Sequence, residues 1–269
     1  MKVITFTAIK GGVGKTTMTF NFASWLSNQN KKILLIDLDH QCNLTTLFEE
    51  TRKNNTVAEV FKEDGNGEVK IDKVGDYIDL IPGYLDLDDI ANKLESNSNK
   101  EMLLYLWIRN NYDELNLEKY DYILIDTHPD FSTITKNAIA ISDYLISPIT
   151  PSEHGYNAKF DLETRLEKFR KQVFNYATGE TYIDAKLYFV ANMIKHNTST
   201  SHELLEHISD DENVLDYIPE KELFNKASTQ HISVFDIAKN DEKTERMNKV
   251  FYQKIEQVFS NITNKLFIK

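Results

Sequence analysis

Glycines and lysines near the start of the chain occur in an order that suits phosphate binding. Residues 3–17 read VITFTAIKGGVGKTT, an apolar stretch followed by a glycine-rich turn that contains Lys10 and Lys15. Backbone N–H groups in such a turn can surround a phosphate, and a helix beginning near Lys15 directs its positive end at the same anion. The pattern predicts that Lys15 contacts the β- and γ-phosphates of a nucleotide and that Thr16 gives its hydroxyl to Mg²⁺.

The usual form of this motif, G-x-x-x-x-G-K-[ST], requires glycine at position 9, where this chain has Ile9. The chain instead matches K-G-G-x-G-K-T-T, with an additional lysine at Lys10. On these positions the sequence resembles the ParA/MinD family of deviant Walker A ATPases. The resemblance implies ATP as the nucleotide and an ATP-sandwiched homodimer in which Lys10 reaches the nucleotide of the other subunit. Nucleotide contacts are then expected from Lys10, Gly11, Gly12, Val13, Gly14, Lys15, Thr16 and Thr17.

A second candidate segment is ILLIDLDHQCN, residues 33–43, in which an apolar strand ends in Asp37 and Asp39. The carboxyl ends of the strands in an open α/β sheet lie at one edge, beside the glycine loop. The family reads D-x-D-P-Q-x-N here, and His40 replaces its proline. The resemblance assigns the attacking water to Asp39 and the outer shell of the metal to Asp37. The alternative is that the two carboxylates only cap the next helix. We interpret His40 as a substitution at a turn position rather than as a proton carrier.

The third candidate segment is YDYILIDTHPD, residues 120–130, an apolar strand that ends in Asp126. A single carboxylate in this position holds Mg²⁺, usually through water. The family commonly reads D-x-P-P, and His128 replaces the first proline. Mg²⁺ prefers oxygen ligands and no second histidine lies at ligand spacing along the sequence, which argues against His128 as a metal ligand.

Two further segments resemble the family less specifically. SPITPSE, residues 147–153, resembles the turn that passes close to the nucleotide before a long helix. Asn192 follows the strand LYFVA at a position where relatives often place an adenine contact. A strand-end turn residue is the alternative for Asn192.

Apolar, β-rich runs alternate with longer helical patterns, which predicts an α/β fold with a doubly wound, mostly parallel sheet and helices on both faces. We expect a single P-loop ATPase domain over residues 1–269. Strands are predicted at residues 3–7, 33–38, 77–81, 122–126, 144–147, 187–191 and 214–218. Helices are predicted at residues 15–28, 101–112, 132–141, 153–176, 199–209 and about 245–267.

The predicted last helix carries an apolar stripe. Its members are Phe251, Ile255, Val258, Ile262 and Leu266, at steps of four, three, four and four. Such a stripe could be a membrane-binding tail of the MinD type. We expect it to dock on the core, because the polar face of the helix contains few lysines.

The chain carries a net charge of −11, which ordinarily argues against nucleic acid as a partner. Acidic residues concentrate between Glu63 and Glu95, so a local basic face is still possible elsewhere. Candidate cations are Lys195, Lys221, Lys226, Lys239, Lys243, Arg246 and Lys249. Cys42 is the only cysteine, which excludes an internal disulfide and argues for a reducing cytoplasm. No leader or apolar run of spanning length is evident, so no membrane association is expected.

Within the family, the nitrogenase iron protein is excluded because its cluster needs two cysteines from each subunit. The chain most resembles small ParA-type partition proteins that lack a preceding helix-turn-helix. That resemblance implies non-specific DNA binding by the ATP dimer and slow, Mg²⁺-dependent hydrolysis stimulated by a ParB-like, DNA-bound adaptor. One alternative is a MinD-like membrane-associated positioning ATPase. The other is a nucleotide-gated regulatory protein with little turnover, suggested by the two histidines at proline positions.

Overall fold

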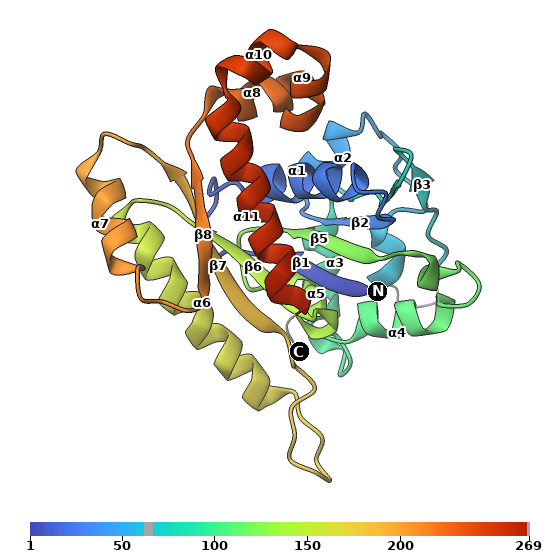
Figure 1. Cartoon of the computed structure of the whole chain (residues 1–269). Helices are drawn as coiled ribbons and strands as arrows, with labels where there is room; N and C mark the ends of the chain where they lie inside the picture. The colour runs from blue at the N-terminus through green and yellow to red at the C-terminus, as the bar shows by residue number, and fades with distance from the viewer. Residues whose placement is uncertain (62–66, 268–269) are drawn as a thin grey trace.

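In the computed structural model, which describes residues 1–61 and 67–267, an eight-stranded sheet forms the central layer (Figure 1). The strand order is β3-β4-β2-β5-β1-β6-β7-β8, and β3 alone pairs antiparallel. The strands are β1 (Lys2–Phe6), β2 (Ile33–Leu38), β3 (Asp72–Lys73), β4 (Ile78–Ile81), β5 (Tyr122–Thr127), β6 (Tyr144–Ile149), β7 (Lys186–Ile194) and β8 (Val214–Pro219). The predicted doubly wound, mostly parallel fold is confirmed. Glu63 and Asp64 of the acidic stretch lie outside the described residues.

Helices cover both faces of this sheet (Figure 1). They are α1 (Lys15–Ser27), α2 (Asn43–Leu47), α3 (Leu87–Lys93), α4 (Leu103–Asn111), α5 (Thr133–Ile141), α6 (Glu153–Gln172), α7 (Ser199–His207), α8 (Glu222–Thr229), α9 (Val234–Asn240), α10 (Glu242–Met247) and α11 (Lys249–Phe267). Short 3-10 turns lie at Val57–Phe61, Leu94–Ser96 and Leu117–Lys119. Every residue of β2, β5 and β6 is buried, as expected for parallel strands covered on both faces.

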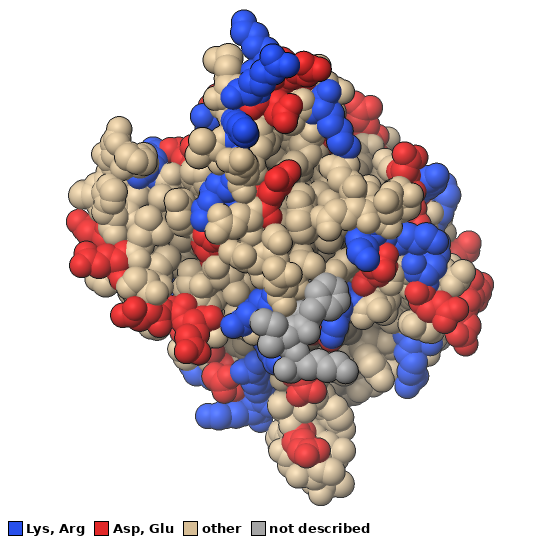
Figure 2. Space-filling view, viewed as in Figure 1, with Lys and Arg blue, Asp and Glu red and all other residues tan. Residues whose placement is uncertain are grey.

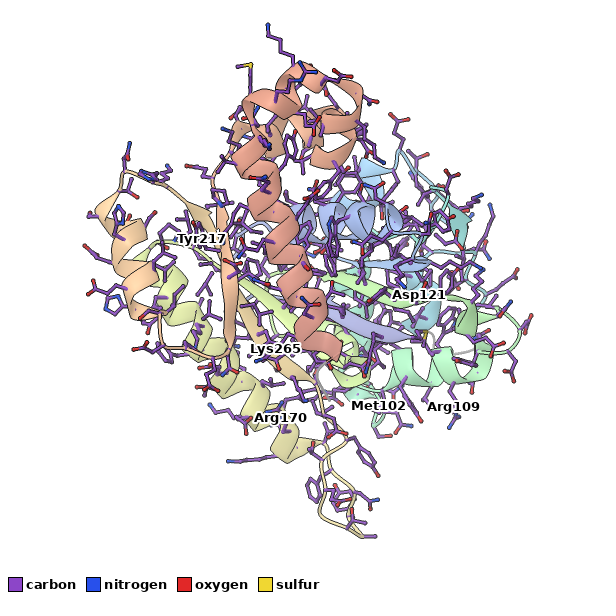
Figure 3. All side chains as sticks on the ribbon, in the orientation of Figure 1. Met102, Arg109, Asp121, Arg170, Tyr217 and Lys265 are labelled. Atoms are coloured by element: carbon purple, nitrogen blue, oxygen red, sulfur yellow. The ribbon has the colours of Figure 1, made fainter. Side chains whose placement is uncertain are left out.

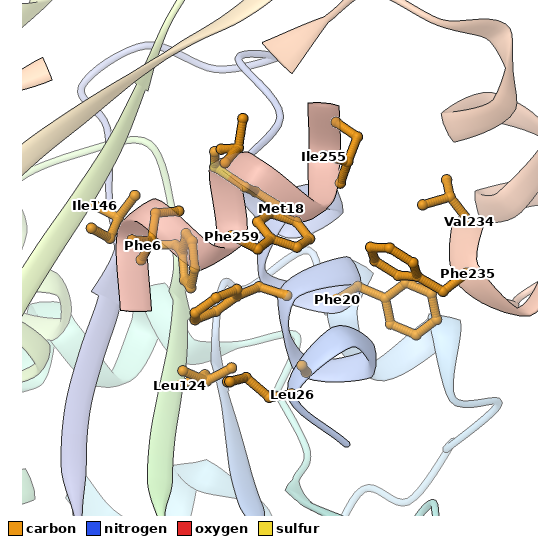
Figure 4. Close-up of a cluster of buried hydrophobic side chains, with 14 of the residues drawn as sticks. Phe6, Met18, Phe20, Leu26, Leu124, Ile146, Val234, Phe235, Ile255 and Phe259 are labelled. Carbon is orange, nitrogen blue, oxygen red and sulfur yellow. The ribbon is translucent and has the colours of Figure 1, made fainter. Parts of the chain in front are cut away.

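One face of the sheet packs against α1, α8, α9 and α11 in a single apolar cluster (Figure 4). Phe259 of α11 meets Phe22 of α1 edge to face, with ring centroids 5.2 Å apart. Ile255, Val258 and Ile262 of α11 are fully buried in the same cluster. The stripe on α11 therefore covers the core; the side chain of Leu266 lies outside those described. No helix in the described ranges is long and apolar enough to cross a membrane.

The opposite face packs against α3 to α7. On this side the predicted helix 153–176 ends earlier, at Gln172. The chain then turns back through a bridge between Phe174 and Thr181, with Gly179 at a φ of 74°. Near the end of α6, Arg170 donates a hydrogen bond to the carbonyl of Ala185 just before β7, which ties the helix to the sheet (Figure 3).

The predicted helix at about 245–267 is two helices, α10 and α11, separated at Asn248. Asp241 begins the first of them, because its carboxylate accepts hydrogen bonds from the N–H groups of Lys243 and Thr244. The sequence patterns also missed β3 and the short helices α2, α3, α8 and α9. Segments this short depend on packing against the rest of the fold rather than on their own periodicity.

Candidate functional site

The glycine loop connects β1 to α1, as the sequence predicted. Gly12 and Gly14 adopt left-handed φ values of 70° and 93°, which only glycine adopts without strain. At Gly14 space is limiting as well, because a Cβ there would lie 2.4 Å from Nδ2 of Asn192. Helix α1 begins immediately afterwards at Lys15, so its free N–H groups face the loop.

Thr16 and Asp126 lie in direct contact at the carboxyl edge of the sheet. The hydroxyl of Thr16 donates to Oδ2 of Asp126 over 2.6 Å. The buried amine of Lys15 is close enough to Asp126 and Asp39 to interact electrostatically with both carboxylates. Burial lowers the pKa of Lys15, and the two carboxylates oppose that shift. Residues predicted from two separate motifs therefore share one site.

Asp126 is fully buried, and burial raises its pKa to about 8, with the charge of Asp37 adding to the shift and Lys15 opposing it. Its second oxygen, Oδ1, has no hydrogen-bond partner among the described residues. An unpartnered carboxylate oxygen beside a threonine hydroxyl is a donor set that Mg²⁺ prefers. Thr16 and Asp126 therefore fit the predicted metal.

Asp37 lies beside Asp126, since the two residues are register partners on β2 and β5. Its carboxylate accepts hydrogen bonds from Thr45, through the backbone N–H at 2.9 Å and the hydroxyl at 2.7 Å, and from the N–H of Asp39 at 3.1 Å. Burial raises the pKa of Asp37 to about 6, although these hydrogen bonds act in the opposite direction and lower it. Both oxygens are thus engaged in holding the turn between β2 and α2, the arrangement expected of the capping alternative.

Asp39 is 4% exposed and contacts a histidine from the loop after β5, the neighbouring strand in the sheet. Its Oδ1 accepts a hydrogen bond from the N–H of Gln41 at 2.9 Å and lies 3.0 Å from Nδ1 of His128. The rings of His40 and His128 are in contact, with centroids 4.1 Å apart. No second histidine lies at ligand spacing from His128 along the sequence, but in the structure His40 lies beside it. The missed signal was that both histidines follow strand-end aspartates on neighbouring strands.

The side chain of Lys10 reaches the segment before α6. Its Nζ lies 3.1 Å from Oγ of Ser152, which caps α6 by accepting a hydrogen bond from the N–H of Gly155. Ser152, in the segment SPITPSE, therefore contacts the glycine loop through Lys10, while closeness of this segment to the nucleotide stays a prediction. The side chain of Glu153 lies outside those described.

Asn192, in β7, contacts the backbone of the glycine loop. Its Nδ2 donates a hydrogen bond to the carbonyl of Val13 over 2.7 Å. It also borders a cavity of about 440 Å³ beside the loop, a volume suited to a small-molecule ligand. Other residues around the cavity include Thr17, Met18, Pro219, Lys221 and Asn225. The sequence did not predict the contribution of β8 and α8 to this cavity.

Comparison with known proteins places this site in a family. A family model described as an AAA domain matches residues 1–177, more than half of the chain. The virulence plasmid ParA family protein pGP5-D of Chlamydia psittaci is 32% identical over 154 residues, covering 56% of this chain and 58% of that protein. The sporulation initiation inhibitor protein Soj of Bacillus subtilis is 31% identical over 152 residues, covering 55% and 58%. The chain belongs to this family of ParA-like P-loop ATPases.

A solved structure extends the similarity of this ParA-like chain beyond the matched segment. A plasmid partition protein of Borrelia burgdorferi, crystallised with AMPPNP, is 28% identical, with a TM-score of 0.76 and coverage of 98% of this chain and 99% of that one. The two curated relatives are matched over less than two thirds of their own length. The fold is therefore shared over nearly the whole of both chains.

Proposed function

We propose that the chain is a partition ATPase whose ATP-bound homodimer holds DNA and is reset by slow, Mg²⁺-dependent hydrolysis. The observation that carries this proposal is the convergence of the glycine loop, Asp39 and the Thr16–Asp126 pair at one edge of the sheet. The likeness to a plasmid partition protein over nearly the whole of both chains supports the same function. The proposal includes a cytoplasmic location and a ParB-like, DNA-bound adaptor that stimulates hydrolysis.

The site's own residues account for binding and hydrolysis. The N–H groups of the loop and the amine of Lys15 bind the phosphates, and the cavity beside Asn192 accepts the base. Thr16 and Asp126 would hold Mg²⁺, which neutralises charge on the phosphates when bound. Asp39 orients the attacking water by accepting its hydrogen bond and takes up its proton. We expect turnover to be slow, because the water is positioned by one carboxylate.

The dimer part of the proposal depends on Lys10. Its Nζ donates a hydrogen bond to Ser152, whereas Lys15 lies close to Asp126. One lysine therefore suffices for the nucleotide of its own subunit. We propose that the second reaches a nucleotide across an interface, as the resemblance implies.

The DNA part of the proposal depends on lysines of the C-terminal helices. Figure 2 shows Lys and Arg side chains gathered over α8 to α10, interspersed with acidic ones. Lys195 and Arg246 are paired, with Glu220 and Glu242 respectively, both at 3.1 Å. Among the candidate cations, those that are exposed and form no ion pair with a described residue are Lys221, Lys226, Lys239, Lys243 and Lys249. These lysines are the proposed contacts to DNA phosphates.

One set of measurements tests the proposal. Light scattering with a slowly hydrolysed ATP analogue should show a dimer for the parent and a monomer for Lys10→Ala, whereas Lys15→Ala should fail to bind nucleotide at all. Asp39→Ala should dimerise and turn over at least about a hundredfold more slowly. A parent that binds the analogue and stays monomeric would exclude the sandwich dimer.

The DNA contacts are tested by charge reversal. Lys243→Glu with Lys249→Glu should weaken ATP-dependent DNA binding and lower its salt slope by about two, since each phosphate contact contributes about 0.9. Lys168→Glu with Lys171→Glu, two exposed lysines of α6, is the control matched in charge and should change neither. Equal losses in both variants would indicate a net-charge effect rather than a DNA site. Measurable turnover in the parent also separates this function from the low-turnover regulatory alternative.

No observation favours the MinD-like alternative. The apolar stripe of α11 is buried against α1, so it is not available to a membrane in this conformation. Co-sedimentation of the parent with anionic liposomes in the presence of ATP would be the result that revives that alternative.

A further inference from the structure

Asp39, His40 and His128 form a cluster at the rim of the nucleotide site. They come from the loops that follow β2 and β5, and one ligand atom from each lies within 4.8 Å of the other two. Both histidines stand where the resemblance to the family leads one to expect proline. We propose that this cluster binds a divalent transition-metal ion of the zinc type, distinct from Mg²⁺ at Thr16 and Asp126.

The donor set selects that class of ion. Two imidazoles and one carboxylate suit zinc, copper, nickel or iron, whereas Mg²⁺ prefers oxygen ligands alone. Three protein ligands also leave a fourth, open position on a tetrahedral ion. This arrangement differs from the oxygen-only pair formed by Thr16 and Asp126.

The distances require only small side-chain adjustments. Metal–ligand bonds near 2.1 Å in a tetrahedron place neighbouring ligand atoms about 3.4 Å apart. Here Oδ1 of Asp39 and Nδ1 of His128 are 3.0 Å apart, and every separation in the cluster is within 4.8 Å. The histidine side chains are 26% and 24% exposed, so both rings can rotate toward a shared ion without disturbing the core.

The surroundings support cation binding. Asp88 of α3 places Oδ2 3.1 Å from Nδ1 of His40, which makes it available as the outer carboxylate that metal-bound histidines commonly have. The N–H of Gln41 holds Asp39 in place. Two further carboxylates, Asp37 on β2 and Asp126 on β5, are near enough to interact electrostatically with Asp39.

An ion bound here controls the enzyme through Asp39, a consequence that rests on the proposed function. A metal-bound carboxylate can no longer accept the proton of the attacking water, so hydrolysis stops. The glycine loop and Lys15 are not ligands of the ion, so nucleotide binding persists. Transition-metal binding therefore holds the protein in its nucleotide-bound state.

Binding is tested first, on the full chain without nucleotide. Titration with Co²⁺ alone should produce visible ligand-field absorption at one ion per chain, and Zn²⁺ should displace it. His40→Gln and His128→Gln, checked for folding by circular dichroism, should each weaken binding at least about tenfold. His207→Gln, an exposed histidine of α7, should not. Absence of absorption, or equal affinity in His40→Gln and the parent, would overturn the proposal.

Regulation is tested separately, so that its failure and that of the metal site are distinguishable. With Mg²⁺ and ATP present, stoichiometric Zn²⁺ should reduce turnover of the parent at least about tenfold, while affinity for a fluorescent ATP analogue stays within about twofold. The His40→Gln/His128→Gln double variant should keep its own zinc-free rate when Zn²⁺ is added. Equal inhibition of parent and double variant would overturn regulation through this cluster.

Discussion

The side-chain amide of Asn192 donates a hydrogen bond to the backbone carbonyl of Val13 over 2.7 Å, although 179 positions separate the two residues. The bond fastens the glycine loop, which follows β1, to β7, which lies two strands away in the sheet. A strand-end residue expected to contact adenine thus also supports the loop that receives the phosphates.

Asn192→Ala should weaken ATP and GTP binding by the same factor, about five- to tenfold, because it leaves the Val13 carbonyl without its partner and loosens the loop. Competition titrations with a fluorescent nucleotide give both affinities. A selective loss of ATP affinity, with GTP unaffected, would instead support the predicted adenine contact.

Gly14→Ala should reduce ATP affinity by more than about tenfold. The new Cβ would combine a left-handed φ of 93° with an approach of 2.4 Å to Asn192, so the loop must move. Gly179→Ala is the control, because that residue is also left-handed, at 74°, but faces open space. It should lower the free energy of unfolding by about 1–2 kcal/mol and leave ATP affinity unchanged. Equal affinities in the two variants would contradict the clash.

Asp126→Asn should stabilise the nucleotide-free protein increasingly as pH rises. The pKa of Asp126 is about 8 in the fold against an ordinary 3.8, so the folded state holds a proton that the unfolded chain has lost. The free energy of unfolding of the parent therefore falls as pH rises from 3.8 to about 8. The variant has no carboxyl group at this position, so it does not show that loss.

The measurement is the difference in Tm between variant and parent at about pH 5 and about pH 8, where about 1 kcal/mol corresponds to about 2–4 °C. The difference should widen by several degrees at the higher pH. Asp184→Asn, an exposed aspartate before β7, should show no such widening. A constant difference for Asp126→Asn would mean that the carboxylate is already ionised at the lower pH.

Ile255→Ala should lower the free energy of unfolding by about 2–5 kcal/mol, because this fully buried side chain of α11 fills the cluster around α1. Val250→Ala, on the same helix but 80% exposed, should change it by less than about 0.5 kcal/mol. Urea unfolding curves provide both values. Similar small effects in both variants would show that α11 is dispensable for the core.

The sequence by itself determined those parts of this protein that depend on the pattern of a few neighbouring residues. The turn that ends at Gly14 and Lys15, and the buried strands that end in Asp37 and Asp126, were identified because glycine spacing and continuous apolar runs act over a few residues. The parallel sheet followed from the alternation of such runs with helices. The approximate limits of α1 and β2 were predicted for the same reason.

Only the tertiary structure decided which of these ends meet. His40 and His128 come together because β2 and β5 are neighbours in register, with Asp37 opposite Asp126, and pairing between distant strands leaves no local signal. The same pairing lets Asp39 contact His128. The pairing of β2 with β5 thus brings two separate turn substitutions into one cluster beside the nucleotide site.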